Sequence, residues 1–410
     1  MIADRRSEVA SPAPDAGRWL VLFGIWLVYL CFGVISVSLA PVVAPITRDL
    51  GLSHGAMGSV LGVWQLVYIA AAIPCGTLLD RLGARRALFI GAVIIAASGL
   101  ARGFATDYWT LLLAVGLFGI GGPIISSGAP KAVAQLFTGS QRGLAMGIYI
   151  TGPAIGSVIV LSLTNAVAMP WLGQDWQGVL LLWSLFAFAG AGVWLLLSLH
   201  PAARRLDTPA GSGPRPKQAQ VIGDLLKLPA VRLLLLMAVG IFSFNHGLNN
   251  WLPELLRHGG MSATAAGFWA TVPTAVGILG SLLIPRLATP DRRFVLLAGL
   301  GLAAMAASLL LDTTTEPVLM LGLVLQGIAR SSLMTVAILT LVETRGVGER
   351  HAGTASGLFF SFAEIGGAGG PILLGVLYDA TGGFDAGLYL LAGIGALLAV
   401  AAMGLRRIGR

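Results

Sequence analysis

Residues 76–86, Gly76-Thr-Leu-Leu-Asp80-Arg81-Leu-Gly83-Ala-Arg85-Arg86, place four charged side chains within seven positions of an otherwise apolar region. Apolar runs at 56–79 and 87–105 lie on either side. Each run is close to the roughly 20 residues that an α-helix needs to cross the hydrocarbon core of a membrane. The segment therefore predicts two membrane helices joined by a short charged loop.

The rest of the chain repeats this alternation. Of its 410 residues, 56% are hydrophobic and 11% are charged, and the mean hydropathy is +0.85. A water-soluble chain could not bury so much apolar surface, so the composition excludes a soluble enzyme, a nucleic-acid-binding protein and a disordered chain. We predict an all-α membrane protein with twelve transmembrane helices, at residues 19–41, 56–79, 87–105, 109–137, 143–166, 179–199, 231–256, 264–287, 293–312, 317–342, 353–377 and 386–405.

The basic residues predict how these helices are oriented. If the first helix starts in the cytoplasm, 21 of the 26 Lys and Arg residues lie on the cytoplasmic side, and only Arg48, Arg102 and Arg257 lie on the other. The positive-inside rule then places both termini in the cytoplasm of a bacterium, with the chain in its inner membrane. We expect cytoplasmic tails at 1–18, without a signal peptide, and 406–410, a cytoplasmic linker at 200–230, and six-helix bundles at 19–199 and 231–405.

The two bundles resemble each other in sequence, which predicts a tandem duplication with pseudo-symmetric halves. The matched segments occur in the same order, offset by 208 to 210 positions: Gly51-Leu-Ser with Gly58 and Gly260-Met-Ser with Gly267, Gly119-Ile and Gly327-Ile, and Gly143-Leu-Ala-Met-Gly147 and Gly353-Thr-Ala-Ser-Gly357. Glycines four residues apart share a helix face and predict close backbone approach, at Gly143/Gly147, Gly152/Gly156, Gly353/Gly357 and Gly366/Gly370.

On the residues 76–86 the chain resembles the major facilitator superfamily, whose loop signature combines glycine, an acid, glycine and paired basic residues. The resemblance extends over nearly the whole chain and implies alternating access around a central site. Asp80 near a helix end can pair with arginines and cap neighbouring helices, which would latch the bundles in one conformation. We therefore expect conformational gating by Asp80, Arg81, Gly83, Arg85 and Arg86. The alternative is that these are only topogenic charges.

Two opposite charges lie near mid-membrane, Arg330 in the tenth predicted helix and Glu364 in the eleventh. Charges at this depth are costly and rarely face lipid, so we expect the two to be partners. They form either a fixed structural ion pair or a functional site, in which Arg330 binds substrate and Glu364 couples protons.

The seventh predicted helix carries a polar cluster, Asn245, His246, Asn249 and Asn250, in a segment that Gly247 and Pro253 weaken. Such a cluster is expected to line water or substrate. His246 is either a hydrogen-bonding residue between helices or a second candidate for proton coupling. The predicted substrate-binding residues are Arg330, Asn245, His246, Asn249, Tyr29, Trp64, Tyr149 and Gln326, and Gln65, Tyr68 and Thr274 are among further polar candidates.

The motif Phe244-Asn-His-Gly-Leu-Asn-Asn-Trp251-Leu-Pro253 is similar to the cyanate and 2-nitroimidazole permease branch of the superfamily. This resemblance implies a small solute, often an anion, moved without ATP. The first hypothesis is thus proton-coupled uptake of a small carboxylate or inorganic anion.

The second hypothesis is proton-driven efflux of a drug-like compound, and a sensor without transport activity is a third. The sequence has no nucleophile constellation, metal-ligand spacing or phosphate loop, so we expect no enzyme, no metal and no cofactor. The expected partners are a small-molecule substrate, protons and the lipid bilayer, with no nucleic acid and a monomeric state.

Overall fold

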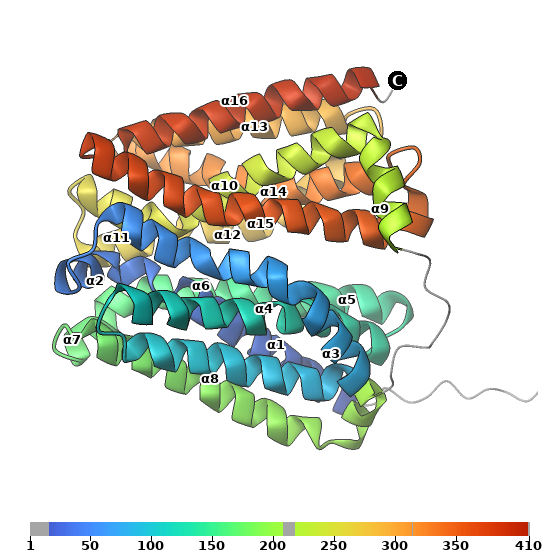
Figure 1. Cartoon of the computed structure of the whole chain (residues 1–410), viewed down its shortest axis with the longest axis horizontal. Coiled ribbons are helices and arrows are strands. Elements are labelled where there is room, and N and C mark those ends of the chain that lie inside the picture. Colours follow the sequence, from blue (N-terminus) through green and yellow to red (C-terminus); the bar gives the residue numbers. More distant parts are fainter. Residues whose placement is uncertain (1–15, 208–217, 314, 409–410) are drawn as a thin grey trace, which may run out of the picture.

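The computed structural model describes residues 16–207, 218–313 and 315–408, which are almost entirely helical (Figure 1). The first half of the chain contains α1 (Ala16–Val37), η1 (Ala40–Val42), α2 (Val43–Asp49), α3 (His54–Gly103), α4 (Tyr108–Leu136), α5 (Gly139–Tyr149), α6 (Thr151–Leu163), η2 (Thr164–Ala168), α7 (Met169–Trp171) and α8 (Trp176–Ser198). The second half contains α10 (Pro229–His258), α11 (Ala263–Trp269), α12 (Val272–Leu287), α13 (Arg293–Leu310), α14 (Glu316–Val342), α15 (Gly348–Thr381) and α16 (Asp385–Ile408). Between them lie η3 (Pro201–Asp207) and α9 (Gln218–Lys227).

Eleven helical segments of the described chain are long and apolar enough to cross a membrane, and the longest holds two crossings. That segment is α3, whose 50 residues include a non-helical position at Gly83, with φ 77° and ψ 163°. The expected loop between the second and third predicted helices is thus a kink at one glycine within continuous helical structure. Counting both parts of α3, the fold has the twelve expected crossings.

Gly83 is required at the kink for two reasons. Its positive φ is unfavourable for other residues, and a β-carbon there would lie 2.7 Å from Leu206 O and 2.8 Å from Asp207 Cα. This approach brings η3 against the kink, where Arg85 Nε donates to Asp207 Oδ1 at 2.9 Å and Arg85 Nη2 lies 2.6 Å from Asp207 Oδ2. The glycine and the bidentate pair together fix the return of the chain from α8.

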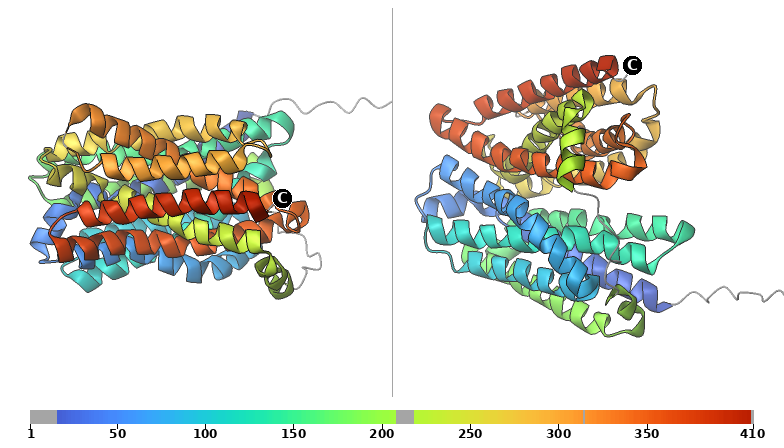
Figure 2. Two further views of the ribbon diagram at one scale, coloured as in Figure 1. Left: turned by 90° about the horizontal axis from the view of Figure 1, so that it is seen from above. Right: turned by 45° about the vertical axis from the view of Figure 1, so that its right-hand side comes forward.

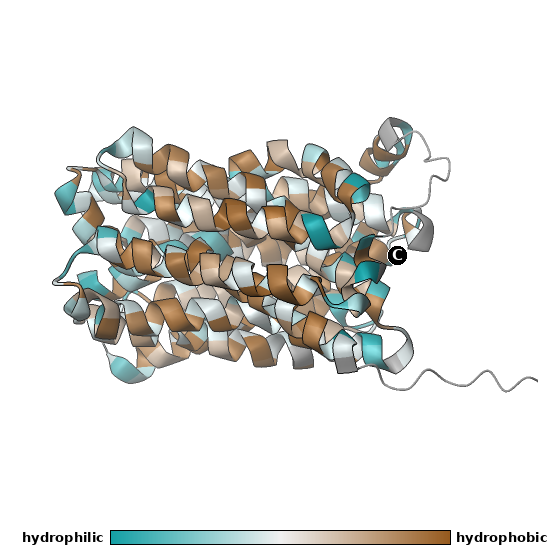
Figure 3. Cartoon of the chain, turned by 90° about the horizontal axis from the view of Figure 1, so that it is seen from below, coloured by the Kyte–Doolittle hydropathy of each residue, from teal (hydrophilic) through white to brown (hydrophobic). Residues whose placement is uncertain are grey.

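Apolar side chains cover the outside of the helices. Large residues such as Leu113, Leu397 and Val400 are about 70% exposed, at 71%, 69% and 69%. Figure 3 shows apolar residues along the middle of the helices and polar residues toward their ends. Such a surface would be unfavourable in water and fits a hydrocarbon environment.

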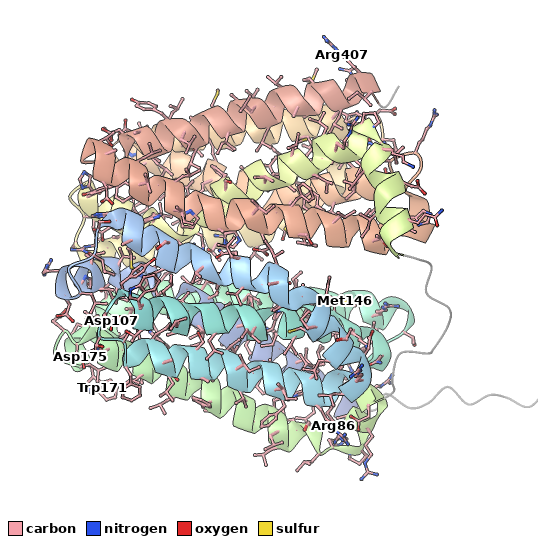
Figure 4. All side chains as sticks on the ribbon, viewed as in Figure 1. Arg86, Asp107, Met146, Trp171, Asp175 and Arg407 are labelled. Atoms are coloured by element: carbon pink, nitrogen blue, oxygen red, sulfur yellow. The ribbon has the colours of Figure 1, made fainter. Side chains whose placement is uncertain are left out.

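The molecule has two ends across this apolar band. At one end, called here the terminal end, α1 begins and α16 finishes, and Figure 4 places Arg86 and Arg407 there. At the opposite end, called here the distal end, lie α2, α7 and α11, with Asp107 and Asp175 (Figures 1 and 4).

Several helices that start at the distal end carry side-chain caps. Asp107 Oδ1 accepts from Thr110 N at 2.9 Å in a capping box, and this bond holds the pKa of Asp107 below its ordinary value. The predicted repeat is visible in two further caps: Ser53 caps α3 and Ser262 caps α11. Two residues before each serine, Gly51 and Gly260 have positive φ values of 62° and 97°. The same sequence pattern therefore builds the same turn in both halves.

The two halves contact each other closely in their distal parts. On α3, a β-carbon at Gly58 would lie 2.5 Å from Pro371 O, and one at Gly62 would lie 2.6 Å from Ala368 O, both on α15. On α11, Gly267 likewise meets Leu161 O of α6. These glycines let backbones from different halves approach each other, as small residues do at helix contacts in membranes.

In the terminal part the corresponding positions face open space. A β-carbon at Gly76, Gly143, Gly147, Gly353 or Gly357 would meet nothing within 4 Å. Figure 2 shows the two groups of helices spread apart toward this end. The close approach expected at Gly143/Gly147 and Gly353/Gly357 is thus absent from this conformation, whereas Gly156 meets Leu30 O of α1 and Gly370 meets Ser243 O of α10.

Candidate functional site

A cavity of about 500 Å³ lies between the two halves, at the level where close contact gives way to open space. Side chains from α1, α3, α5 and α6 form one wall, and those from α10, α12 and α14 form the other. Six of the predicted substrate-binding residues line it: Tyr29, Trp64, Asn245, His246, Asn249 and Arg330.

Arg330 reaches the cavity from α14 with neutral partners. Its Nη1 donates to Asn249 Oδ1 at 3.0 Å and to Thr274 Oγ1 at 3.3 Å. Asn245 Nδ2 donates to the backbone oxygen of Arg330 at 3.2 Å. The guanidinium Nε and Nη2 have no hydrogen bond to any described residue. One edge of a positively charged group is therefore held in place, and the other is available to a ligand in the cavity.

The expected partnership of Arg330 and Glu364 is wrong for this structure. Glu364 is 7% exposed on α15, does not line the cavity, and its Oε2 is buried without a hydrogen bond. The physical reason is rotational position: Asn249 on α10 and Thr274 on α12 occupy the space around the guanidinium. Equal depth on successive helices did not determine which faces meet.

Glu364 instead belongs to a cluster at the contact of the two halves. A β-carbon at Gly367 would lie 3.1 Å from Glu364 Oε2, 3.2 Å from Gln65 Cγ and 3.4 Å from His246 Cδ2. Gln65 Nε2 and His246 Nδ1 form a hydrogen bond of 3.2 Å from α3 to α10. Gln65 Oε1 is also buried without a partner. This cluster therefore contains two buried acceptor oxygens, on Gln65 and Glu364, that lack a donor among the described residues.

Two further predicted residues lie behind the cavity wall. Tyr149 stacks on Tyr29, with ring centroids 5.4 Å apart and planes at 27°. Gln326 is 1% exposed, and its Oε1 has no hydrogen-bond partner. Neither lines the cavity.

Several cavity residues could not be recognised from the sequence, because nothing in their type or spacing distinguishes them from other residues of membrane helices. Phe32, Phe242 and Met334 look like ordinary helix residues, and Ser331 and Thr335 look like the small polar residues common in membrane helices. The one usable signal was position: Ser331 follows Arg330, and Phe242 lies four residues before His246. The unrecognised cavity residues are Phe32, Ser36, Val37, Gly147, Ile150, Pro153, Ala154, Ser157, Phe242, Gly277, Ile278, Ser281, Ser331, Met334 and Thr335.

Arg102 also departs from expectation. From the sequence it was expected on the side opposite the cytoplasm, at the end of the helix 87–105, yet it is 1% exposed. Its Nη1 donates to Ile35 O at 2.6 Å and to Ser38 Oγ at 3.0 Å, and its guanidinium lies 5.6 Å from the centroid of Phe118. Arg102 thus joins α3 to the end of α1 and is not a solvated charge.

Two of the candidate gating residues, Asp80 and Arg85, have described side-chain partners. Asp80 Oδ1 lies 2.9 Å from Lys131 Nζ on α4. The sequence had instead suggested the arginines of the loop as its partners. Arg85 pairs with Asp207, as described above, and also donates to Ser198 O at 3.2 Å. Arg81 and Arg86 are exposed. Lys131 lies 51 residues after Asp80 along the chain, so the two could not have been matched without knowing how α3 and α4 pack.

Comparisons with known proteins agree with this architecture. The chain matches the family described as the Major Facilitator Superfamily over residues 22–290 and 248–409. It is 26% identical to the D-galactonate transporter of Escherichia coli O6:H1, covering 98% of this chain and 99% of the relative. It is 27% identical to a quinolone resistance transporter of Acinetobacter baumannii, covering 84% and 83%.

A solved structure has the same fold. A bacterial homologue of the human lysosomal transporter Spinster, crystallised in an inward-facing and unoccupied conformation, superimposes with a TM-score of 0.72. The two chains are 20% identical, and the match covers 96% of each. From the match over nearly all of its length, the chain belongs to the Major Facilitator Superfamily.

Proposed function

We propose that this transporter moves a small anionic solute across the bacterial inner membrane by alternating access, as proton-coupled uptake. The observation that supports it is the free edge of Arg330 in the cavity between the halves. A guanidinium binds a carboxylate through two parallel N–H···O bonds, and this pairing is strong where water is scarce. Of the relatives, the D-galactonate transporter carries an acid by its name. Neither of the named relatives is described as a cyanate or 2-nitroimidazole permease, so the proposal names small anions only.

The orientation follows from charge. The terminal end carries Arg86, Arg406 and Arg407 and is assigned to the cytoplasm, with 19–199 and 231–405 as the two bundles of a monomer. In this assignment the cavity communicates with the cytoplasm and is sealed from the outside.

Glu364 carries the coupled proton in this proposal. A buried carboxylate without a partner is strongly unfavourable, and a proton on it supplies the missing donor of the cluster. Gln65 belongs to one half, and Glu364 and His246 belong to the other. Gain or loss of the proton therefore changes the contact between the halves, which is where the transporter must move.

The experiment compares wild type with Arg330→Lys and Arg330→Gln in proteoliposomes, with labelled D-galactonate and labelled benzoate as probes, and scores the uptake of whichever anion wild type carries. Lysine keeps the positive charge but lacks the paired N–H donors of the guanidinium, and glutamine lacks the charge. Uptake should therefore fall at least about tenfold for both variants while the proteins stay folded. Arg257→Lys is the matched control, because Arg257 pairs with Glu254 near the distal end. Normal uptake by both Arg330 variants would overturn the proposal. Loss of folding in both would assign Arg330 a structural role instead.

Efflux of a drug-like compound is the second candidate. It is favoured by the aromatic side chains in the cavity and by the likeness to a quinolone resistance transporter. Accumulation of a quinolone in inverted membrane vesicles, driven by a pH gradient, would support efflux over uptake.

A further inference from the structure

We infer that the cavity selects organic anions that carry a single carboxylate on an apolar, ring-containing body, and that it disfavours dianions and polyhydroxylated acids. This inference rests on the proposed function, because it assumes that Arg330 binds the substrate. It concerns the chemical class of that substrate.

The charge of the cavity lining suits a ligand with a single carboxylate. Among the described residues that line the cavity, Arg330 is the only arginine or lysine, and none is an acid. Arg102 is also buried, but it lies behind the wall with Ile35 O and Ser38 as its partners. One guanidinium edge matches one carboxylate. A second carboxylate would enter the cavity without a partner, which is costly in a low-dielectric site.

Several hydroxyl groups that line the cavity already donate their protons to backbone oxygens. Ser157 Oγ donates to Pro153 O at 2.8 Å, Ser331 Oγ to Gly327 O at 3.0 Å, and Thr335 Oγ1 to Ser331 O at 3.0 Å. These protons are used within the residue's own helix, so the hydroxyls can accept but not donate. With these three donors committed, the several hydroxyl oxygens of a sugar acid would find fewer donors in the cavity than in water and would lose hydrogen bonds on entry.

The walls of the cavity are largely aromatic and aliphatic. Tyr29, Phe32, Trp64 and Phe242 present rings from both halves, and Ile278 and Met334 add aliphatic surface. The rings of Tyr29 and Phe32 lie 5.7 Å apart, and Phe242 lies 5.4 Å from the ring of His246. Aromatic walls favour flat, apolar ligands through burial and stacking. A volume of about 500 Å³ accommodates a fused two-ring body with its carboxylate.

The test is a thermal-stability titration of the purified wild-type protein with four probes: 1-naphthoate, 1-naphthamide, naphthalene-1,8-dicarboxylate and D-galactonate. A ligand that binds the folded state raises its melting temperature, and the rise grows with the logarithm of the ratio of ligand concentration to dissociation constant. We expect 1-naphthoate to bind at least about tenfold more tightly than each of the other three. Counterflow of labelled 1-naphthoate in proteoliposomes should confirm that it is carried.

The variant Arg330→Gln distinguishes the inferred substrate class from the proposed anion transport. It should remove the preference for naphthoate over naphthamide while leaving naphthamide binding unchanged, because the rings are untouched. If D-galactonate or the dicarboxylate binds as tightly as naphthoate, and Arg330→Gln abolishes that binding, the substrate class is wrong and the proposed anion transport stands. If no acid binds better than the amide in wild type, the proposed function fails as well.

Discussion

Arg330 is held by an amide and a hydroxyl, and this choice of partners has a functional meaning. An acidic partner would neutralise the guanidinium and compete with a substrate anion. Asn249 and Thr274 fix its position through Nη1 and leave its charge unbalanced. Hydrogen bonds to a charged group contribute about 1.5–3 kcal/mol each, enough to orient the side chain without cancelling its attraction for an anion.

At Glu364 we predict a separation of transport from coupling. Glu364→Gln resembles the protonated acid permanently, so accumulation of substrate driven by a pH gradient should be lost while exchange of labelled substrate at equal pH continues. Both are measured in proteoliposomes. Glu254→Gln, at the salt bridge with Arg257, is the control and should keep coupling. If Glu364→Gln still accumulates substrate, the proton site is elsewhere, and His246→Gln is then tested in the same assay.

Individual residues were predictable from the sequence where the free-energy cost of a polar side chain in a membrane helix identifies them. A charge or an amide in a membrane helix is expensive wherever it points, so Arg330, Asn245 and Asn249 could be singled out without a structure. Partners were not predictable, because they depend on helix rotation and on which helices touch. Glu364 was therefore matched to Arg330, whereas the structure places it beside Gln65 and His246.

At the level of elements, α3 and α4 are tied near the Gly83 kink by the contact of Asp80 with Lys131. We predict that Asp80→Asn lowers turnover several-fold with little change in ligand affinity, because neither residue of the pair lines the cavity. Turnover is measured in proteoliposomes and affinity by thermal shift. Lys131→Gln should reproduce the effect. A large loss of affinity at unchanged turnover would contradict this role.

The exposed glycines of α15 allow a second prediction at this level. Gly353 lies five helical turns from Pro371, and Gly357 lies about three turns from Ala368, so they share the face that contacts α3 at the distal end. When the terminal end closes, this face should approach Gly76. Leucine at 353 and 357 would fill the space, so Gly353→Leu with Gly357→Leu should retain ligand binding but slow turnover at least about tenfold.

The matched control is Gly393→Leu on α16, an exposed position where a β-carbon also meets nothing within 4 Å. It does not face the other half and should transport normally. Equal activity of the double variant and the control would show that the α15 glycines do not enter a closing contact. Measuring counterflow and binding on the same preparations keeps misfolding apart from blocked movement.

At the scale of the whole molecule, the fold was predictable from periodic and compositional features. Twelve apolar runs, a polar linker and repeated Gly-x-Ser turns indicated two similar halves, and the family and fold agree. The conformation was not predictable, because the same helices can contact each other at either end. The sequence offers glycines for both contacts, and only the structure tells which are in use.

The distal seal includes a helix cap shared between the halves. Asp379 at the end of α15 accepts from His54 N at 2.9 Å and Gly55 N at 2.7 Å at the start of α3. We predict that Asp379→Asn weakens this seal, so that a cysteine placed at Ser157 in the cavity reacts faster with a membrane-impermeant maleimide added from outside. Asp175→Asn, a cap within one half, is the control. Unchanged labelling would show that the seal does not depend on the carboxylate.

The shared cap also sets how the molecules divide between their two orientations at rest. Two such hydrogen bonds at about 1 kcal/mol each would favour the sealed distal end by roughly thirtyfold over a seam of glycine contacts alone. An external ligand would then meet a binding-competent site roughly thirtyfold less often than without the cap, and its apparent dissociation constant would rise by about that factor. Affinity measured from outside and affinity measured from the cytoplasm should therefore differ, even though both refer to the same cavity.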